Sequence, residues 1–409
     1  MKKSPALFLI IFPMIFSAGK VFPKSPVILG NERFVADYAS RLKGKKLGLV
    51  INHTSVLPSG ISLLQALEEK GFIPAAIFAP EHGLSGQAAA GIHQSDGRMK
   101  DIPLYSLYGQ RKKPAPEQIS RINALVYDIQ DIGARFYTYI STMKYVIEAG
   151  AEAGIPVYIL DRPNPVGGNI IEGPLLRKEH ESFIGSVPIP VRYGLTCGEL
   201  ALMMKGEGWV SQNVDLHVIP MKNWKRSEFW EDTGLEWIPP SPNIPTPETA
   251  IIYPGTGLLE AVGVNAGIGT ILPFLQFGAP WIEPQKIITS LSEGEEFGLR
   301  LSPTKFYPIP RKSKTMHPLY EYQVCPGVHI EILHKEKLHS FRFTLFLIEA
   351  LKVLYPGRIS PDVDRLNLIF GTKFLVNYLQ GKISRGQAML EMEEEERLFR
   401  RKRAPYLLY

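Results

Sequence analysis

The sequence predicts an α/β protein in which a larger domain, built on a mainly parallel sheet, precedes a smaller α/β domain. Short apolar runs alternate with helical stretches from residue 31 to residue 221, which is the pattern of βαβ units. Beyond a proline-rich run at 238–247 (IPPSPNIPTP), the pattern changes to glycine-rich turns. We therefore expect domains over residues 25–245 and 246–409 with a cleft between them.

Each expected element has its own signal. Helical spacing of apolar residues, with glycine at several ends, predicts helices over residues 31–42, 61–70, 116–122, 141–153 and 196–205. Apolar runs predict strands over residues 46–52, 74–79, 104–107, 124–129, 156–160 and 215–221. In the second domain we expect a helix at 284–294, a strand at 328–333 and two C-terminal helices.

The N-terminus has the features of a secretory signal peptide. Lys2 and Lys3 precede an apolar run at 6–16, and the small residues Ser-Ala-Gly follow at 17–19. The run is too short to span a membrane, and no cysteine follows it to carry a lipid. We expect residues 1–19 to be removed and the mature protein to be periplasmic or secreted, without a stable membrane anchor.

Charge and cysteine content narrow the class of protein. The net charge of +6 is spread thinly over 409 residues. The one basic cluster, at 400–403, follows glutamates at 393–396 with i,i+4 spacing, which favours a solvated helix end over a nucleic-acid patch. Cys197 and Cys325 could form one disulfide, but their places in different expected domains favour two separate thiols.

Polar side chains follow four of the predicted strands. In the stretch 73–86 (IPAAIFAPEHGLSG), the strand stops at Pro80 and is followed by Glu81 and His82. Because parallel strands end at one edge of a sheet, all four groups should meet in one crevice. Carboxylates, imidazoles, arginines and tyrosines together favour an anionic, hydroxyl-rich ligand. The other three strand ends supply Asn52 and His53; Asp131, Arg135, Tyr137 and Tyr139; and Asp161, Arg162 and Asn164.

Each of these residues also has a structural interpretation. Glu81 could cap a helix, although Gly83 and Gly86 favour a loop. The aspartates could bond backbone groups at turns, and the tyrosines could belong to the core. The remaining alternatives are an ion pair of Arg135 with Asp131 or Asp128, a turn at Asn164 between two prolines, and a cap at His53.

Several cofactor motifs are absent from the sequence. It contains no GxGxxG after the first strand and no GxxxxGK[ST], which disfavours a nucleotide enzyme. It contains no GxSxG nucleophile elbow and no HExxH or close cluster of histidines and cysteines. We therefore expect no cofactor and no metal.

A series of motifs in order resembles the bacterial exo-β-N-acetylmuramidase family NamZ. They are APEHGLSG, PLYSLYG, YDIQDIGARFYTYIST, LDRPNPVGG with IEGP, PIPVRYGLTCGEL, MKNWKRSEFW, SPNIPT and YPGTGLLE, and the likeness runs from about Gly48 to the terminal PYLLY. The resemblance implies a Rossmann-like N-terminal domain, a smaller C-terminal α/β domain and an active site in the cleft between them. It also implies release of N-acetylmuramic acid from the non-reducing end of peptidoglycan fragments, so that the partner is a muramyl saccharide.

The resemblance also suggests roles for the residues. The predicted catalytic residues are Glu81, His82 and Asp131, and Glu81, in the PEHG motif, is the expected general acid/base. Glycoside hydrolysis usually needs a second group that acts as nucleophile or base or gives electrostatic support. We expect this group to be Asp131 or the acetamido group of the substrate itself. Arg135 or Arg162 would hold the lactyl carboxylate bidentately. The full substrate-binding prediction is Asn52, His53, Arg135, Tyr137, Tyr139, Asp161, Arg162, Asn164, Arg192 and Asn243.

The resemblance is weakest in the divergent loop, residues 265–275. Family members read close to EGRGTTKPFE there, whereas four apolar residues of this chain replace two acids, an arginine and a lysine. This favours as alternatives a muramyl-sugar-binding relative without turnover, or a hydrolase for another N-acyl sugar. The sequence leaves the anomeric outcome and the oligomeric state open. The four replacing residues are Ala266, Ile268, Leu272 and Leu275.

Overall fold

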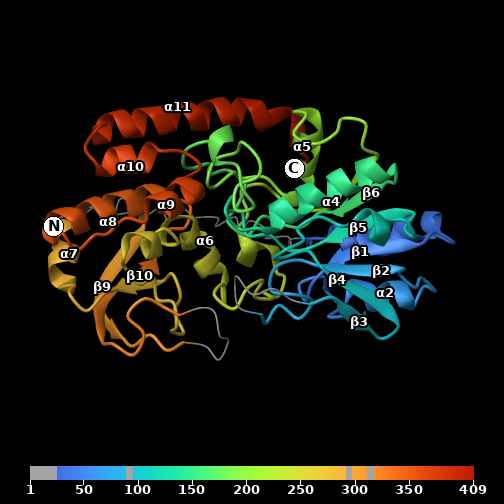
Figure 1. Cartoon of the computed structure of the whole chain (residues 1–409), viewed down its shortest axis with the longest axis horizontal. Coiled ribbons are helices and arrows are strands. Elements are labelled where there is room, and N and C mark those ends of the chain that lie inside the picture. The colour runs from blue at the N-terminus through green and yellow to red at the C-terminus, as the bar shows by residue number, and fades with distance from the viewer. Residues whose placement is uncertain (1–24, 89–94, 292–296, 311–316) are drawn as a thin grey trace, which may run out of the picture.

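The computed structural model describes residues 25–88, 95–291, 297–310 and 317–409, so the predicted signal peptide at 1–19 lies outside the described residues. Its larger sheet has seven strands in the order β3-β4-β2-β1-β5-β6-β7, and all neighbours are parallel except β3 and β4 (Figure 1). The strands are β1 (Leu47–Ile51), β2 (Ala76–Ala79), β3 (Gly97–Met99), β4 (Ile102–Ser106), β5 (Ala124–Asp128), β6 (Val157–Leu160) and β7 (Leu216–Ile219).

Helices cover both faces of this sheet. Every residue of β1 and of β5 is buried, which requires apolar cover on both sides. Leu49 and Ile77 share one apolar cluster with Phe34, whereas Val50 and Phe78 share the other with residues of α4. The helical segments of this part are α1 (Gly30–Arg33), η1 (Phe34–Tyr38), η2 (Ala39–Leu42), α2 (Leu63–Glu68), α3 (Pro116–Ile119), α4 (Tyr139–Ala153), η3 (Lys178–His180), α5 (Cys197–Gly206) and η4 (Trp230–Thr233).

The C-terminal part contains a second, antiparallel sheet in the order β8-β10-β9. The sequence predicted only one of its strands and two of the four helices that follow, because β9 alternates irregularly and two of those helices are short. The elements are α6 (Pro247–Thr256), η5 (Leu259–Val262), β8 (Gln276–Gly278), α7 (Pro284–Ser290), β9 (Leu299–Phe306), β10 (Cys325–Ile332), α8 (Ser340–Leu354), α9 (Val363–Phe370), α10 (Phe374–Leu379), α11 (Arg385–Arg403) and η7 (Ala404–Tyr406).

Helix α11 connects the two parts of the chain. In Figure 1 it runs from α10 over the smaller part to the neighbourhood of α5. The Glu395 carboxylate accepts a hydrogen bond from the Leu175 amide at 2.7 Å, and Arg403 donates to the Tyr193 carbonyl at 3.2 Å. The helix is therefore fixed to loops that follow β6, although it lies late in the sequence.

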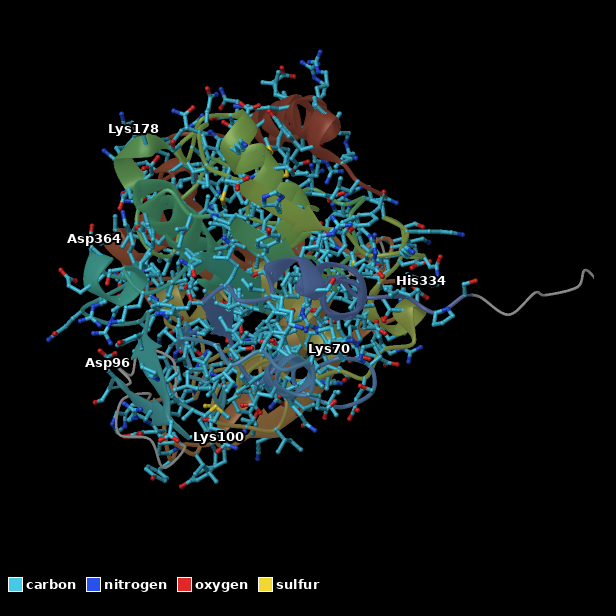
Figure 2. The ribbon with its side chains drawn as sticks, turned by 90° about the vertical axis from the view of Figure 1, so that its right-hand side faces the viewer. Lys70, Asp96, Lys100, Lys178, His334 and Asp364 are labelled. Atoms are coloured by element: carbon cyan, nitrogen blue, oxygen red, sulfur yellow. The ribbon has the colours of Figure 1, made fainter. Side chains whose placement is uncertain are left out.

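Charged side chains of both signs project from the surface, as Lys70, Asp96, Lys100 and Lys178 show in Figure 2. Some of them are paired, such as Lys100 with Glu68 at 2.8 Å. Among the described residues, no helix combines the length and the apolar character needed to cross a bilayer.

The last residue, Tyr409, supports the sheet from outside. Its hydroxyl donates to the buried Asp161 carboxylate at 2.6 Å and accepts from the Met221 amide at 2.8 Å. Asp161 also accepts from the Gly198 amide at the start of α5, so one carboxylate joins three segments. The C-terminal tyrosine is therefore part of the fold.

Tyr409→Phe is expected to lower the free energy of unfolding by about 1–3 kcal/mol, because it leaves a buried carboxylate oxygen and an amide short of a partner. Urea unfolding followed by circular dichroism measures the change. Tyr406→Phe is the matched control, since its hydroxyl bonds Glu207 nearer the surface. Equal stability of the two variants would contradict this role of Tyr409.

Candidate active site

Three neighbouring strands deliver the candidate catalytic groups. Glu81 follows β2, Asn52 follows β1 and Asp131 follows β5, and these strands lie side by side in the order β2-β1-β5. All three strands are parallel, so the three side chains lie at the same carboxyl edge of the sheet. The prediction of a shared edge therefore corresponds to the observed strand order.

Glu81 is held in a polar but shielded position. The side chain is 8% exposed, and its Oε2 accepts a hydrogen bond from the Thr138 hydroxyl at 2.6 Å. Thr138 lies immediately before α4, so the start of that helix fixes the carboxylate. The loop containing Glu81 is thus anchored to the element that follows β5.

Two histidines, His53 and His82, lie in the loops that follow β1 and β2. His82 has a positive φ of 69°, unusual for a residue other than glycine, and its Nδ1 bonds the Ala88 carbonyl at 2.6 Å. Burial lowers the pKa of His82, although the neighbouring Glu81 opposes this. Burial also lowers the pKa of His53, whose Nε2 lies 2.7 Å from the Pro239 carbonyl. Burial therefore favours the neutral form of both rings.

Gly86 is required by the close approach of His53. A Cβ at position 86 would lie 1.9 Å from Cε1 of the His53 ring, and the φ of Gly86 is +70°. The glycines after PEH thus let the loop fold onto the histidine that follows β1.

Tyr139 lies between the three strand ends. Its hydroxyl accepts from Asn52 Nδ2 at 3.2 Å and donates to the Pro240 carbonyl at 2.8 Å. Tyr137 packs edge-on against it at 4.8 Å, and Tyr253 of α6 packs edge-on against Tyr137 at 6.2 Å. This tyrosine cluster brings α6 to the edge of the larger sheet.

Both carboxylates act electrostatically on the tyrosine cluster. Burial raises the pKa values of Tyr139 and Tyr253 above the ordinary value of a tyrosine. The charges of Glu81 and Asp131 raise both pKa values further.

Asp131 is buried and only partly hydrogen-bonded. Its Oδ2 accepts from the Gly133 amide at 2.7 Å and from the Tyr193 hydroxyl. Its Oδ1 is buried and has no hydrogen bond partner among the described residues. Burial raises the pKa of Asp131 to about 6, while the bond from Tyr193 opposes the rise. Asp131 therefore changes charge just below neutral pH.

Two predicted substrate ligands, Arg135 and Arg192, lie inside the protein and do not face a cleft. Both are 0% exposed. Arg135 donates to the carbonyls of Pro174, Ile189 and Ile369 at 2.7, 2.6 and 3.0 Å, and Arg192 donates to the Leu338 carbonyl at 3.1 Å. These guanidinium groups satisfy buried backbone carbonyls, so their prediction as substrate ligands is corrected.

Arg135→Met is expected to lower the free energy of unfolding by about 3 kcal/mol, because three buried carbonyls lose their donors. KM of the folded variant should remain unchanged. Chemical unfolding and steady-state kinetics measure the two effects. Arg400→Met is the control, since Arg400 makes one exposed bond to the Asn169 carbonyl. A large rise in KM with unchanged stability would restore Arg135 as a substrate ligand.

Three further predicted ligands also have structural partners. Asn164 bonds the Leu195 carbonyl at 2.9 Å and the Val166 amide at 3.1 Å, as a turn residue does. Asp161 is 0% exposed and its carboxylate caps α5. Arg162 pairs with Asp128 through Nε at 2.6 Å and Nη2 at 3.0 Å. The bidentate face of Arg162 is therefore already in use, and it cannot grip a substrate carboxylate in that way.

Asn243 lies in the proline-rich segment and is half-buried. Its backbone amide donates to the Ser241 hydroxyl at 3.3 Å. Carbonyls 239 and 240 of this segment bond His53 and Tyr139. The segment thus borders the site through its backbone.

Sequence reasoning missed three side chains of the site. Thr138 bonds Glu81, Tyr193 bonds Asp131, and Tyr253 closes the tyrosine cluster. Thr138 stands between the two predicted tyrosines, and Tyr193 follows Arg192 directly. All three belong to the motifs quoted from the sequence, within which the prediction favoured charged groups over hydroxyl groups.

The divergent loop, 265–275, reaches the tyrosine cluster through Phe274. The Phe274 ring lies 4.8 Å from the Tyr253 ring, edge-on, and its backbone φ is +66°. Ala266 and Ile268 are buried, whereas Leu272 and Leu275 are half-buried. Two of the four apolar replacements therefore lie within the C-terminal core.

The two cysteines form no disulfide with each other. Cys197 and Cys325 are both buried and unpaired. The described part of the chain contains no group of three or more histidine, cysteine, aspartate or glutamate side chains that could hold a metal ion.

Comparisons with known proteins find similarity over most of the chain. The family model described as exo-β-N-acetylmuramidase NamZ, N-terminal, matches residues 47–248, and the corresponding C-terminal model matches residues 251–409. A relative from Bacillus subtilis, the peptidoglycan β-N-acetylmuramidase NamZ, is 37% identical over 401 residues, which cover 96% of this chain and 94% of the relative.

Two solved structures of DUF1343 family proteins from Bacteroides fragilis share the fold. One is 35% identical with a TM-score of 0.87, over 95% of this chain and 100% of its own. The other is 32% identical with a TM-score of 0.75, over 94% of this chain and 99% of its own. The α/β architecture with its second, smaller sheet is therefore shared with solved proteins.

Proposed function

The chain belongs to the exo-β-N-acetylmuramidase NamZ family, and from this premise we propose that it removes N-acetylmuramic acid from the non-reducing end of peptidoglycan fragments. It is a glycoside hydrolase. We place this activity at one edge of the larger sheet, because two shielded carboxyl groups, Glu81 and Asp131, lie there. Glycoside hydrolysis usually uses two such groups.

Glu81 is proposed as the general acid. The Thr138 hydroxyl donates to Oε2, so in the acid form the proton resides on Oε1. From there it can pass to the glycosidic oxygen as the bond to the leaving sugar breaks. The anion that remains can then take a proton from the incoming water.

Asp131 is proposed as the second carboxylate. Tyr193 and Gly133 fix one of its oxygens, and the other has no partner among the described residues. Negative charge on that oxygen would stabilise the positive charge that develops on the sugar ring in the transition state. The tyrosine cluster between the two acids offers apolar faces for the ring.

The function is tested with two disaccharides that differ only in sugar order. N-acetylmuramyl-N-acetylglucosamine should release free N-acetylmuramic acid, detected by chromatography. N-acetylglucosaminyl-N-acetylmuramic acid should remain intact, because its muramyl residue is at the reducing end. Equal cleavage of both, or cleavage of the second alone, would contradict the proposed specificity.

We also propose that the protein acts outside the cytoplasm. The support is the basic, apolar and small-residue order of residues 1–19. Expression of the full chain with cell fractionation should place the protein in the periplasm or medium, with a mature N-terminus near Lys20. Retention in the cytoplasm with Met1 intact would refute export.

A further inference from the structure

A pocket opens at the same sheet edge, near the ends of β1, β5 and β6. Apolar side chains form most of its wall, and Thr54, Gln130 and Arg162 contribute polar groups. Thr54 links it to the candidate active site, because its hydroxyl donates to Asn52 Oδ1 at 2.6 Å and Asn52 in turn donates to Tyr139. The apolar wall includes Leu29, Val56, Leu57, Trp230 and Ile238.

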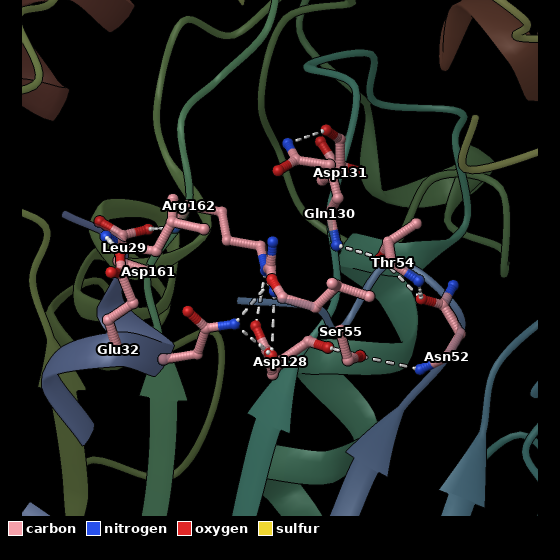
Figure 3. Close-up of polar contacts among 12 residues, drawn as sticks. Leu29, Glu32, Asn52, Thr54, Ser55, Asp128, Gln130, Asp131, Asp161 and Arg162 are labelled. Carbon is pink, nitrogen blue, oxygen red and sulfur yellow. Dashed lines mark hydrogen bonds and ion pairs between the residues drawn. The ribbon is translucent and has the colours of Figure 1, made fainter. Parts of the chain in front are cut away.

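Arg162 offers one donor to this pocket. The residue is 4% exposed, and its Nε and Nη2 are held by the Asp128 carboxylate, with a further bond from Nη2 to the Val56 carbonyl. The hydrogen bonds of Arg162 within the described part of the chain are made by its backbone amide, Nε and Nη2, and none of them by Nη1. Figure 3 shows the guanidinium paired below with Asp128, with Gln130 on its other side. A buried arginine thus keeps the two N–H groups of Nη1 for a ligand.

Gln130 offers one acceptor. Its Nε2 donates to the carbonyls of Asp131 and Pro163, both at 2.8 Å, which fixes the orientation of the side-chain amide. Its Oε1 is therefore the oxygen, and this atom is buried with no hydrogen bond partner among the described residues. Gln130 is 3% exposed and lines the pocket. An unpaired buried acceptor favours a ligand that brings an N–H group.

The charge around the pocket disfavours an anion. Asp128 neutralises Arg162, and the exposed Glu236 lies at the pocket wall. A carboxylate such as the lactyl group would meet this negative charge and would leave Gln130 Oε1 without a donor. A neutral group with one acceptor, one donor and a small apolar end fits all the observations.

We propose that this pocket binds the acetamido group of an N-acetylated amino sugar in the substrate. The acetamido oxygen accepts from Arg162 Nη1, its N–H donates to Gln130 Oε1, and its methyl group packs among the apolar side chains. The assignment of the group to a sugar rests on the proposed function. The pocket would make the protein select N-acetylated fragments over fragments with free amines.

The test measures binding of small probes to the full protein by saturation-transfer NMR and calorimetry. N-acetylglucosamine should bind with its methyl group in closest contact, and glucosamine should bind at least tenfold more weakly. Leu57→Trp, which fills the pocket from a half-buried position, should raise Kd for N-acetylglucosamine at least tenfold. Leu390→Trp, at a residue 68% exposed on α11, is the matched control and should change nothing.

Three results would overturn the proposal: no saturable binding of N-acetylglucosamine, equal binding of glucosamine, or no effect of Leu57→Trp. If N-acetyl-L-alanine amide bound more tightly than N-acetylglucosamine, the pocket would be a site for a peptide amide, and the proposal that it binds an amino sugar would be refuted. Release of N-acetylmuramic acid from the disaccharide is measured separately. If N-acetylmuramic acid is released but the probes do not bind, only the proposal for the pocket is overturned. If the probes bind but no N-acetylmuramic acid is released, only the proposed hydrolase activity is overturned.

Discussion

Replacing Glu81 by glutamine is expected to lower kcat/KM for N-acetylmuramyl-N-acetylglucosamine by about 10³-fold, the scale of a lost general acid. The amide keeps the shape of the side chain and can still accept from Thr138, so substrate binding and stability should be preserved. Glu117→Gln, an exposed change on α3, is the control and should keep full activity. Wild-type rates in the Glu81 variant would remove it from the mechanism.

Thr138→Val should give a smaller loss, about tenfold, because it removes one hydrogen bond to a carboxylate without removing the acid. The graded order of the two variants separates a chemical role of Glu81 from a general disturbance of the loop. If Thr138→Val cost as much as Glu81→Gln, the loop and not the proton would explain both.

Asp131→Asn is expected to lower kcat by about 10²-fold while changing KM little, because the transition state loses a facing negative charge. Asparagine can still accept from Tyr193 and Gly133, so the turn after β5 should persist. A variant with normal kcat would leave the substrate's own acetamido group as the second participant.

The pH profile of the wild type follows from the raised pKa of Asp131. A carboxyl group with a pKa of about 6 is ionised above pH 6 and neutral below it. Activity that needs the anion should therefore fall about tenfold per pH unit below pH 6. Tyr193→Phe removes a bond that lowers this pKa, so the acid limb should move to higher pH. If the acid limb of the pH profile did not move in this variant, the loss of activity at low pH would belong to a group other than Asp131.

Much of the larger sheet could be predicted from the sequence because its strands are buried on both faces. The run 124–129 is apolar except for Asp128, and it corresponds to β5 within one residue. The smaller sheet was largely missed, since β9 mixes charged residues and a proline into an edge strand that is half-exposed. Its pairing with β10 depends on tertiary contacts that no local pattern shows.

The candidate site was predicted more accurately in position than in composition. Strand ends placed Glu81 and Asp131 at one edge, because parallel strands finish together. The arginines were misjudged, since a motif cannot show whether a guanidinium faces a cleft or meets buried carbonyls, as Arg135 does. Burial decides that question, and burial is a property of the folded chain.

The role of Glu81 is tested most directly by changing the leaving group. A nitrophenolate departs without protonation, whereas a sugar alkoxide does not. Kinetics of wild type and Glu81→Gln should be compared on the disaccharide and on 4-nitrophenyl β-N-acetylmuramide. A general acid at Glu81 predicts a loss of about 10³-fold on the disaccharide and of only about tenfold on the nitrophenyl glycoside. Equal losses on both substrates would contradict a general acid at Glu81.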